Sequence, residues 1–228
     1  MLHNLKHKFL FLFLFNAFGL CFAQQLSYQK IKDNTAKERS LFATQYVKNK
    51  NNPAAQEKIL IQATNFLLKD IDQYFNAWYG TKWSFHGYTS NPKSGEIACG
   101  YFVTTVLKDM GFNVPRVKWA QLASESMIKH MTSDIKRFSH APMNDVVKYL
   151  KAKGEGVYIV GLDSHVGYIY YYHNKMTFVH SNYYQPHIGV MSEPLMGKNP
   201  LNDSKYRVVG KILDRNMVLK WIKKEPFN

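Results

Sequence analysis

Apolar residues follow a helical period in the first half of the chain and a strand period in the second half. Over residues 54–79 they recur every three or four positions, which predicts a long amphipathic helix ended by Gly80. Similar spacing predicts helices over 97–110, 120–131 and 142–152, with Gly111 stopping the first of these. Residues 24–52 are polar with scattered apolar positions, and hold one helix at most.

Runs rich in Val, Ile and Tyr follow these helices. Residues 157–161, 165–172 and 176–182 predict three strands, with a turn at 173–175, and residues 206–213 predict a fourth. We expect a break at 134–137, a loop after residue 182 and a short closing helix over 217–223. Helices followed by an antiparallel sheet predict an α+β fold.

The first 23 residues have the pattern of a secretory signal. Lys6 and Lys8 precede an almost unbroken apolar run over residues 9–22, and Cys21 and Ala23 are the small residues expected before a cleavage site. The run is shorter than the roughly 20 residues of a membrane span. We therefore expect export and cleavage after Ala23, with an uncleaved anchor as the alternative. A lipid on Cys21 is disfavoured because Leu20 precedes it.

The remaining length suits a polar segment over residues 24–53 and one domain over 54–228. The full chain has a formal net charge of +14, and removing Lys6 and Lys8 lowers it to +12. A basic exported protein is attracted to anionic envelope polymers. The lysines are scattered and form no nucleic-acid motif, so we expect no nucleic-acid partner.

The cysteines point to a reactive thiol. The chain has two, Cys21 and Cys99, and cleavage would leave only Cys99. A lone thiol in an exported protein is a reactive group, an intermolecular crosslink or an inert buried side chain. Cys99 lies at the predicted start of a helix, where unpaired N–H groups and the helix dipole stabilise a thiolate and can bind an oxyanion. This position favours a nucleophile.

A histidine at the head of a strand is suited to act as the base for such a thiol. His165 opens the second predicted strand, where it can face a helix start across a cleft. A third residue that orients the base is expected on the neighbouring strand. His180 and Asn182 are two positions apart there and share one face, so both are candidates.

Several motifs together resemble the NlpC/P60 cell-wall hydrolases. They are Gly80-Thr81-Lys82-Trp83, Ala98-Cys99-Gly100-Tyr101-Phe102-Val103, Val114-Pro115-Arg116, His165-Val166-Gly167 and Phe178-Val179-His180-Ser181. The resemblance covers about residues 80–183. It implies a papain-like core in which a nucleophile helix packs on an antiparallel sheet. It also implies Cys99 as nucleophile, His165 as general base and acid, and His180 as orienter. The implied reaction is hydrolysis of amide bonds in peptidoglycan stem peptides, with no metal or other cofactor.

The chain departs from the family beside the nucleophile. Ala98 replaces the family's Asp, and Gly100-Tyr101 replaces its Ser-Gly; in the family the Asp and Ser help to hold the free amine of the stem peptide. The substrate therefore stays open between peptidoglycan and another peptide or amide. A papain-like protease, an acyl- or amide-transfer enzyme and a non-catalytic envelope-binding protein are the alternatives. Trp83 and Tyr88, on the loop before the nucleophile, are the predicted substrate-binding residues. The oligomeric state is not predicted.

Overall fold

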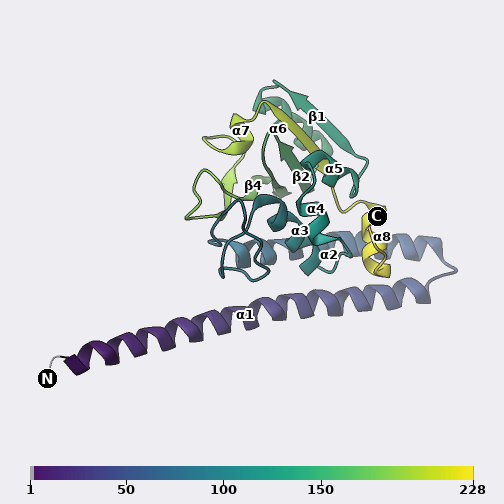
Figure 1. Ribbon diagram of the computed structural model, residues 1–228. Helices are drawn as coiled ribbons and strands as arrows, with labels where there is room; N and C mark the ends of the chain where they lie inside the picture. The colour runs from purple at the N-terminus through teal and green to yellow at the C-terminus, as the bar shows by residue number, and fades with distance from the viewer. Residues whose placement is uncertain (1–2, 228) are drawn as a thin grey trace.

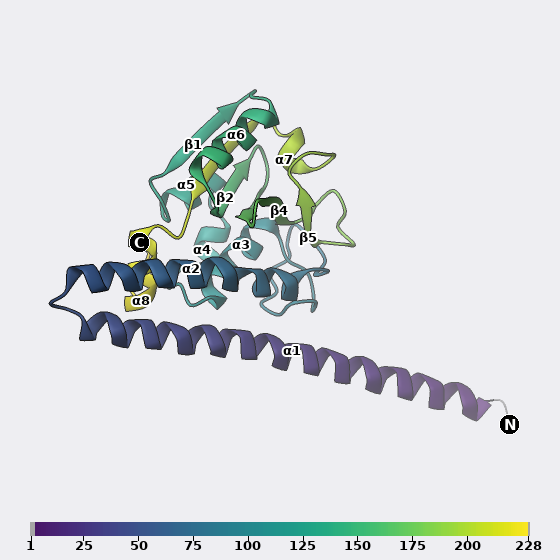
Figure 2. The same ribbon diagram turned by 180° about the vertical axis from the view of Figure 1, so that it is seen from behind.

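Two long antiparallel helices lie beneath a body of mixed helices and strands. The computed structural model describes the backbone of residues 3–227 and the side chains of Gln25 and residues 27–227. Helix α1 (His3–Lys48) runs back along α2 (Pro53–Trp78). The sheet and most other helices lie on the other side of α2, whereas the C-terminal helix contacts both α1 and α2 (Figures 1 and 2). The side chains of the predicted signal segment, residues 1–23, lie outside the described residues, so cleavage after Ala23 stays a prediction. No helix in the described part of the chain is long and apolar enough to cross a membrane.

The body is built on one antiparallel sheet of six strands in the order β1-β6-β2-β3-β4-β5. The strands are β1 (Ile135–Ser139), β2 (Gly156–Leu162), β3 (Val166–Tyr172), β4 (Lys175–Ser181), β5 (Val190–Pro194) and β6 (Tyr206–Lys211). The remaining helices are α3 (Cys99–Asp109), α4 (Arg116–Ala120), α5 (Ser124–Lys129), α6 (Met143–Lys153), α7 (Pro200–Asp203) and α8 (Arg215–Lys223). The α+β class predicted from the sequence is confirmed.

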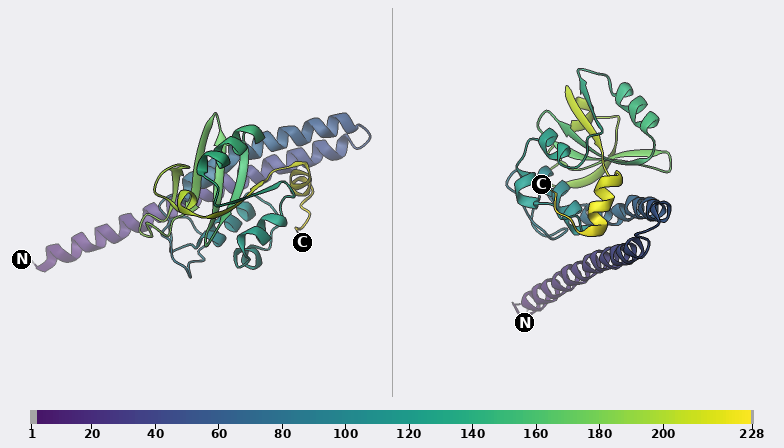
Figure 3. Two further views of the ribbon diagram at one scale, coloured as in Figure 1. Left: turned by 90° about the horizontal axis from the view of Figure 1, so that it is seen from above. Right: turned by 90° about the vertical axis from the view of Figure 1, so that its right-hand side faces the viewer.

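Helices cover both faces of this sheet (Figure 3). Val157 and Ile159 of β2 belong to the core shared with α2, α3 and α5, whereas Tyr158 and Val160 pack with α6 on the opposite face. Side chains alternate between the faces of a strand, so a sheet buried on both sides needs apolar residues at nearly every position. This explains why the central strands read as continuous apolar runs in the sequence.

Helix α1 is fastened to the body by buried polar contacts. The Tyr28 hydroxyl donates to Asp109 Oδ2 at 2.8 Å and accepts from Trp78 Nε1 at 2.8 Å. Thr35, which is 1% exposed, donates to Asp70 Oδ2 at 2.6 Å. Buried polar groups that are fully paired specify one packing arrangement. The polar segment from residue 28 onward therefore packs as part of the body.

Two strands were not predicted from the sequence. The expected break at 134–137 is wrong, because residues 135–139 form the edge strand β1 paired with β6. The charged residues Lys136 and Arg137 interrupt the apolar pattern that predicts a strand. Charged residues are common on edge strands because they prevent pairing with other chains. Strand β5 lies within the expected loop after residue 182. The helix expected over 120–131 is also shorter, because a turn separates α4 from α5.

Candidate active site

Cys99 is the first residue of α3, at a helix start without a side-chain cap. Ala98 before it is extended and makes no capping hydrogen bond. The first N–H groups of a helix have no intrahelical partner, so they remain available to a negatively charged group. Backbone N–H groups of Val166, Gly100 and Cys99 stabilise the thiolate form. The thiol thus lies where the backbone favours negative charge.

Two buried hydrogen bonds hold the Cys99 helix against the sheet. The Tyr168 hydroxyl of β3 donates to the Val103 carbonyl of α3 at 2.7 Å. The Ser181 hydroxyl at the end of β4 donates to the Ile97 carbonyl, two residues before the thiol, also at 2.7 Å. These bonds fix Cys99 relative to the strands that carry the histidines.

Gly100 accounts for one departure from the NlpC/P60 pattern. A Cβ atom at this position would collide with the carbonyl oxygen of Ala120 in α4. The neighbouring atom belongs to the backbone, so it cannot move aside cheaply. A serine in this place is therefore incompatible with the close packing of α3 on α4.

The two histidines form a hydrogen-bonded chain that ends at a carboxylate. His165 lies directly before β3 and is 3% exposed, and its Nε2 is 2.8 Å from Nδ1 of His180 on β4. Nε2 of His180 is in turn 2.8 Å from Oε2 of Glu193 on β5. The chain His165–His180–Glu193 thus crosses from the start of β3 to the edge strand.

Asn182, the alternative orienter, has other partners. Its side chain is buried; Oδ1 accepts the backbone N–H of Tyr184 at 2.8 Å and Nδ2 donates to Met191 Sδ at 3.2 Å. The structure therefore brings His180, rather than Asn182, into hydrogen-bond contact with the ring of His165.

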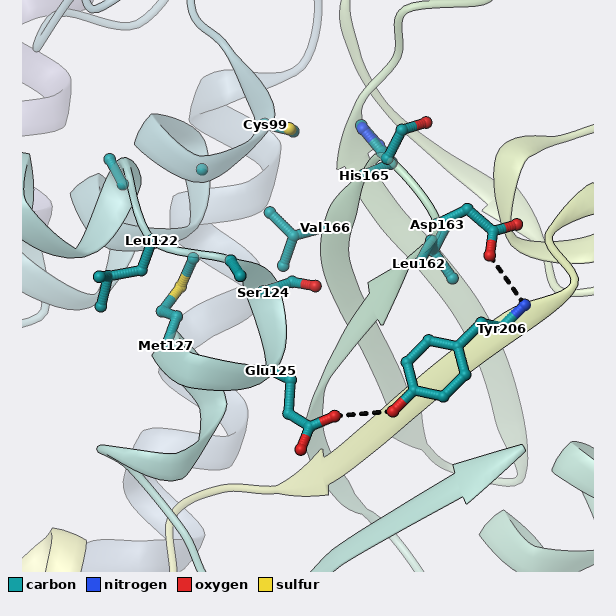
Figure 4. Close-up of a pocket in the computed structure, with 14 residues that line it drawn as sticks. Cys99, Leu122, Ser124, Glu125, Met127, Leu162, Asp163, His165, Val166 and Tyr206 are labelled. Carbon is teal, nitrogen blue, oxygen red and sulfur yellow. Dashed lines mark hydrogen bonds between the residues drawn. The ribbon is translucent and has the colours of Figure 1, made fainter. Parts of the chain in front are cut away.

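Cys99 and His165 line the same cavity, which has a volume of about 490 Å³. Figure 4 shows the sulfur of Cys99 directed toward the ring of His165 at one end of this cavity. At the other end the Tyr206 hydroxyl donates to Glu125 at 2.7 Å. The other lining residues are Gly100, Ala120, Leu122, Ala123, Ser124, Met127, Leu162, Asp163, Ser164 and Val166. The pair thus opens onto a space large enough for part of a substrate.

Burial holds both groups of this pair uncharged. It raises the pKa of the Cys99 thiol, although the surrounding backbone N–H groups act in the opposite direction. Burial, and then the neighbouring His180, lower the pKa of His165 well below its ordinary value. Burial also lowers the pKa of His180, opposed by its hydrogen bond to Glu193. At neutral pH the site therefore holds a thiol beside an imidazole that can accept a proton.

The predicted substrate residues Trp83 and Tyr88 do not line this cavity. Trp83 reaches the site through Tyr183, whose ring centroid lies 6.0 Å from that of Trp83 and 5.0 Å from that of His165. The Nε1 of Trp83 is buried without a partner among the described residues. Tyr88 is 70% exposed and lies near Tyr101, with ring centroids 6.5 Å apart. Trp83 is therefore connected to His165 by aromatic contacts, and Tyr88 flanks α3.

Glu193 and the residues at the far end of the cavity were not predicted from the sequence. Glu193 lies on β5, a five-residue strand that ends at Pro194 and has no clear strand signal. Ser124, Glu125 and Tyr206 come from elements far from the motifs, so only the folded chain brings them to the thiol.

Among the described side chains, no group of three or more His, Cys, Asp or Glu residues could hold a metal ion.

Comparisons with known proteins identify no family for the chain. No protein-family model matches it, and no curated protein matches it. Similar solved structures include two crystal structures of an N-acetylmuramoyl-L-alanine amidase from Bacteroides uniformis. One is 13% identical with a TM-score of 0.33, covering 64% of this chain and 98% of that chain. The other is 12% identical with a TM-score of 0.32, covering 63% of this chain and 99% of that chain. At these values the likeness carries no argument about activity, and the NlpC/P60 resemblance stays a prediction.

Proposed function

We propose that the chain is an exported cysteine hydrolase that cleaves amide bonds, with peptidoglycan stem peptides as its substrate. The observation that carries the proposal is the arrangement of Cys99 at a helix start, facing His165 across a shared cavity. A nucleophile, a base within reach and a third residue that orients the base form the general pattern of nucleophilic catalysis.

In the proposed reaction His165 carries one proton from the thiol to the leaving amine and later a second proton from water to the sulfur. As the Cys99 sulfur attacks the amide carbon, the thiol proton passes to His165 and the carbonyl oxygen becomes an oxyanion. N–H groups at the start of α3 are donors for that oxyanion. Collapse expels the amine, which leaves with the proton from His165, and a thioester remains. Water then gives a proton to His165 and attacks the thioester, and collapse releases a carboxylic acid and restores the thiol.

The residues around the pair support a peptide-like substrate of mixed polarity. Leu122 and Met127 give the cavity an apolar side, and Ser124 and Tyr206 carry hydroxyl groups at its far end. We assign Trp83, together with Tyr183, to the wall on the other side of His165. Tyr88 is assigned to the outer rim beside Tyr101.

Digestion of purified peptidoglycan tests this proposal. The chain from residue 24 onward is incubated with peptidoglycan beside a Cys99→Ala variant, and soluble products are resolved by mass. We expect new muropeptides with the unchanged chain only, and their masses identify the bond that is cleaved. Products from both proteins, or from neither while Cys99 still reacts readily with an alkylating agent, would contradict the peptidoglycan proposal.

The second outcome would favour a different amide substrate for the same thiol. The observation behind this alternative is the loss of the family's Asp and Ser beside the nucleophile, where Ala98 and Gly100 stand. A panel of peptide and amide substrates, tested with the same two proteins, then separates a protease or transfer enzyme from a non-catalytic protein.

A further inference from the structure

We propose that Glu193 is a positioning residue that fixes the proton positions on both histidines, so that His165 presents an unprotonated Nδ1 to Cys99. The inference rests on the proposed function, because it assigns His165 as the base. Glu193 is not among the residues that line the cavity, and it acts only through His180.

The hydrogen-bond chain permits one arrangement of protons. A carboxylate can only accept, so the 2.8 Å contact with Glu193 requires a proton on Nε2 of His180. A neutral imidazole carries one N–H, so Nδ1 of His180 must accept. The 2.8 Å contact at that atom then requires a proton on Nε2 of His165. Nδ1 of His165 is left with a lone pair, which is the form that a general base needs.

Packing holds the middle residue of the chain in one orientation. His180 is fully buried, and its ring stacks on Phe178 with centroids 4.0 Å apart and planes 18° apart. Phe178 lies opposite Glu193 in the β4–β5 register, so Phe178, His180 and Glu193 lie on the same face of the sheet. The carboxylate therefore meets a ring that cannot turn away without disrupting the core.

Glu193→Gln separates the role of the carboxylate from that of side-chain size. A glutamine amide has both a donor and an acceptor, so it is compatible with either proton arrangement on His180. In the wrong arrangement Nδ1 of His180 donates to Nε2 of His165, and the proton of His165 then sits on Nδ1, facing the thiol. We expect the variant to populate both arrangements.

The test is a ¹⁵N spectrum of the histidine rings, which distinguishes a proton on Nδ1 from a proton on Nε2. In the unchanged chain we expect both His165 and His180 to carry the proton on Nε2, with signals assigned by single substitutions. A proton on Nδ1 of either ring in the unchanged chain would overturn the proposal. The ¹⁵N spectrum needs no substrate, so its result does not depend on the outcome of the peptidoglycan assay.

Kinetics with matched variants complete the test. Glu193→Gln is compared with Glu96→Gln, which makes the same charge change at an exposed position on the loop before Cys99. We expect Glu193→Gln to lower kcat in proportion to the share of molecules in the wrong arrangement, about twofold where the two arrangements are equally populated, with KM nearly unchanged. Glu96→Gln should leave kcat unchanged. Equal kcat values for Glu193→Gln and the unchanged chain, or unaltered ring spectra in Glu193→Gln, would refute the role of the carboxylate.

Discussion

Substituting Gly167 by alanine perturbs the histidine chain without touching a catalytic atom. Gly167 lies on β3, next to the part of β4 that carries His180. A Cβ atom there would lie 2.8 Å from the Cβ of His180, 2.7 Å from Cε2 of Phe178 and 3.0 Å from the carbonyl oxygen of Val179. Two of these three neighbours are held by the β4 backbone, so the strand itself must give way.

The size of the effect follows from these distances. Ordinary contact begins near 3.4 Å, so His180 must retreat by about 0.6 Å. A shift of that size weakens its 2.8 Å hydrogen bond to His165. Overpacking of this kind costs about 1–3 kcal/mol, which lowers Tm by roughly 2–12 °C in a chain of this length. Misplacement of the base by part of an ångström lowers kcat by roughly 10- to 100-fold.

The assay combines thermal unfolding with steady-state hydrolysis. The control is Gly156→Ala on β2, where the one neighbour that is too close to the new Cβ is Cε of the flexible Lys211 side chain, at 2.7 Å, and the next, Lys211 Nζ, lies at 3.4 Å. We expect a large loss of kcat in Gly167→Ala and a change of less than a few-fold in Gly156→Ala. If the two variants behave alike, the close approach at Gly167 does not position His180 and the reasoning fails.

Three further predictions concern the same site. Because burial lowers the pKa of His165 and raises that of the thiol, kcat/KM should stay level from below pH 6.5 to above pH 9.0; an acid limb centred at or above pH 6.5 would contradict this. Ser181→Ala removes a buried hydrogen bond to the loop before the thiol, so it should cost about 1–2 kcal/mol in urea unfolding and lower kcat; unchanged values for both would show that this bond does not hold the nucleophile. His180→Ala should lower kcat by about 10²- to 10⁴-fold, whereas Asn182→Ala should affect stability more than kcat; the reverse order would make the asparagine the orienter.

His165 also makes the free energy of unfolding depend on pH. Burial depresses the pKa of His165 in the folded chain, so between that value and pH 6.5 the unfolded chain binds more protons. Keeping His165 neutral therefore costs the folded chain nothing above pH 6.5, and the folded chain loses stability as the pH falls below that value. Urea unfolding of the unchanged chain and of a His165→Gln variant measures this: the unchanged chain should lose more stability between pH 7 and pH 5. An equal loss in both would contradict the assignment.

The sequence predicted the elements whose periodicity is set by burial on one or both sides. Helix α2 keeps an apolar stripe because one side packs on the core, and β2 and β3 are apolar throughout because helices cover both faces. Strand β1 carries charges because it is an edge, and β5 is short and partly exposed, so neither has the pattern of a buried strand.

The residues of the candidate site also differ in whether the sequence predicts them. Cys99, His165 and His180 stand in local contexts that can be identified in the sequence, namely a helix start and two strands. Glu193 meets His180 only because β5 pairs with β4 in one register, and that pairing is a tertiary event. Ser124 and Tyr206 reach the cavity because α5 and β6 both lie against β2, whose end pairs with the start of β3. Contacts of this kind have no short-range signal in the chain.

Activation of Cys99 by His165 is the central step of the proposed reaction, and alkylation of the thiol measures it directly. The chain from residue 24 onward and a His165→Ala variant are treated with iodoacetamide near neutral pH, and adducts are located by peptide mass. We expect a single adduct on Cys99 that forms at least about ten times faster in the unchanged chain, because the imidazole accepts the thiol proton. Equal rates in the two proteins, or no adduct on Cys99, would contradict it.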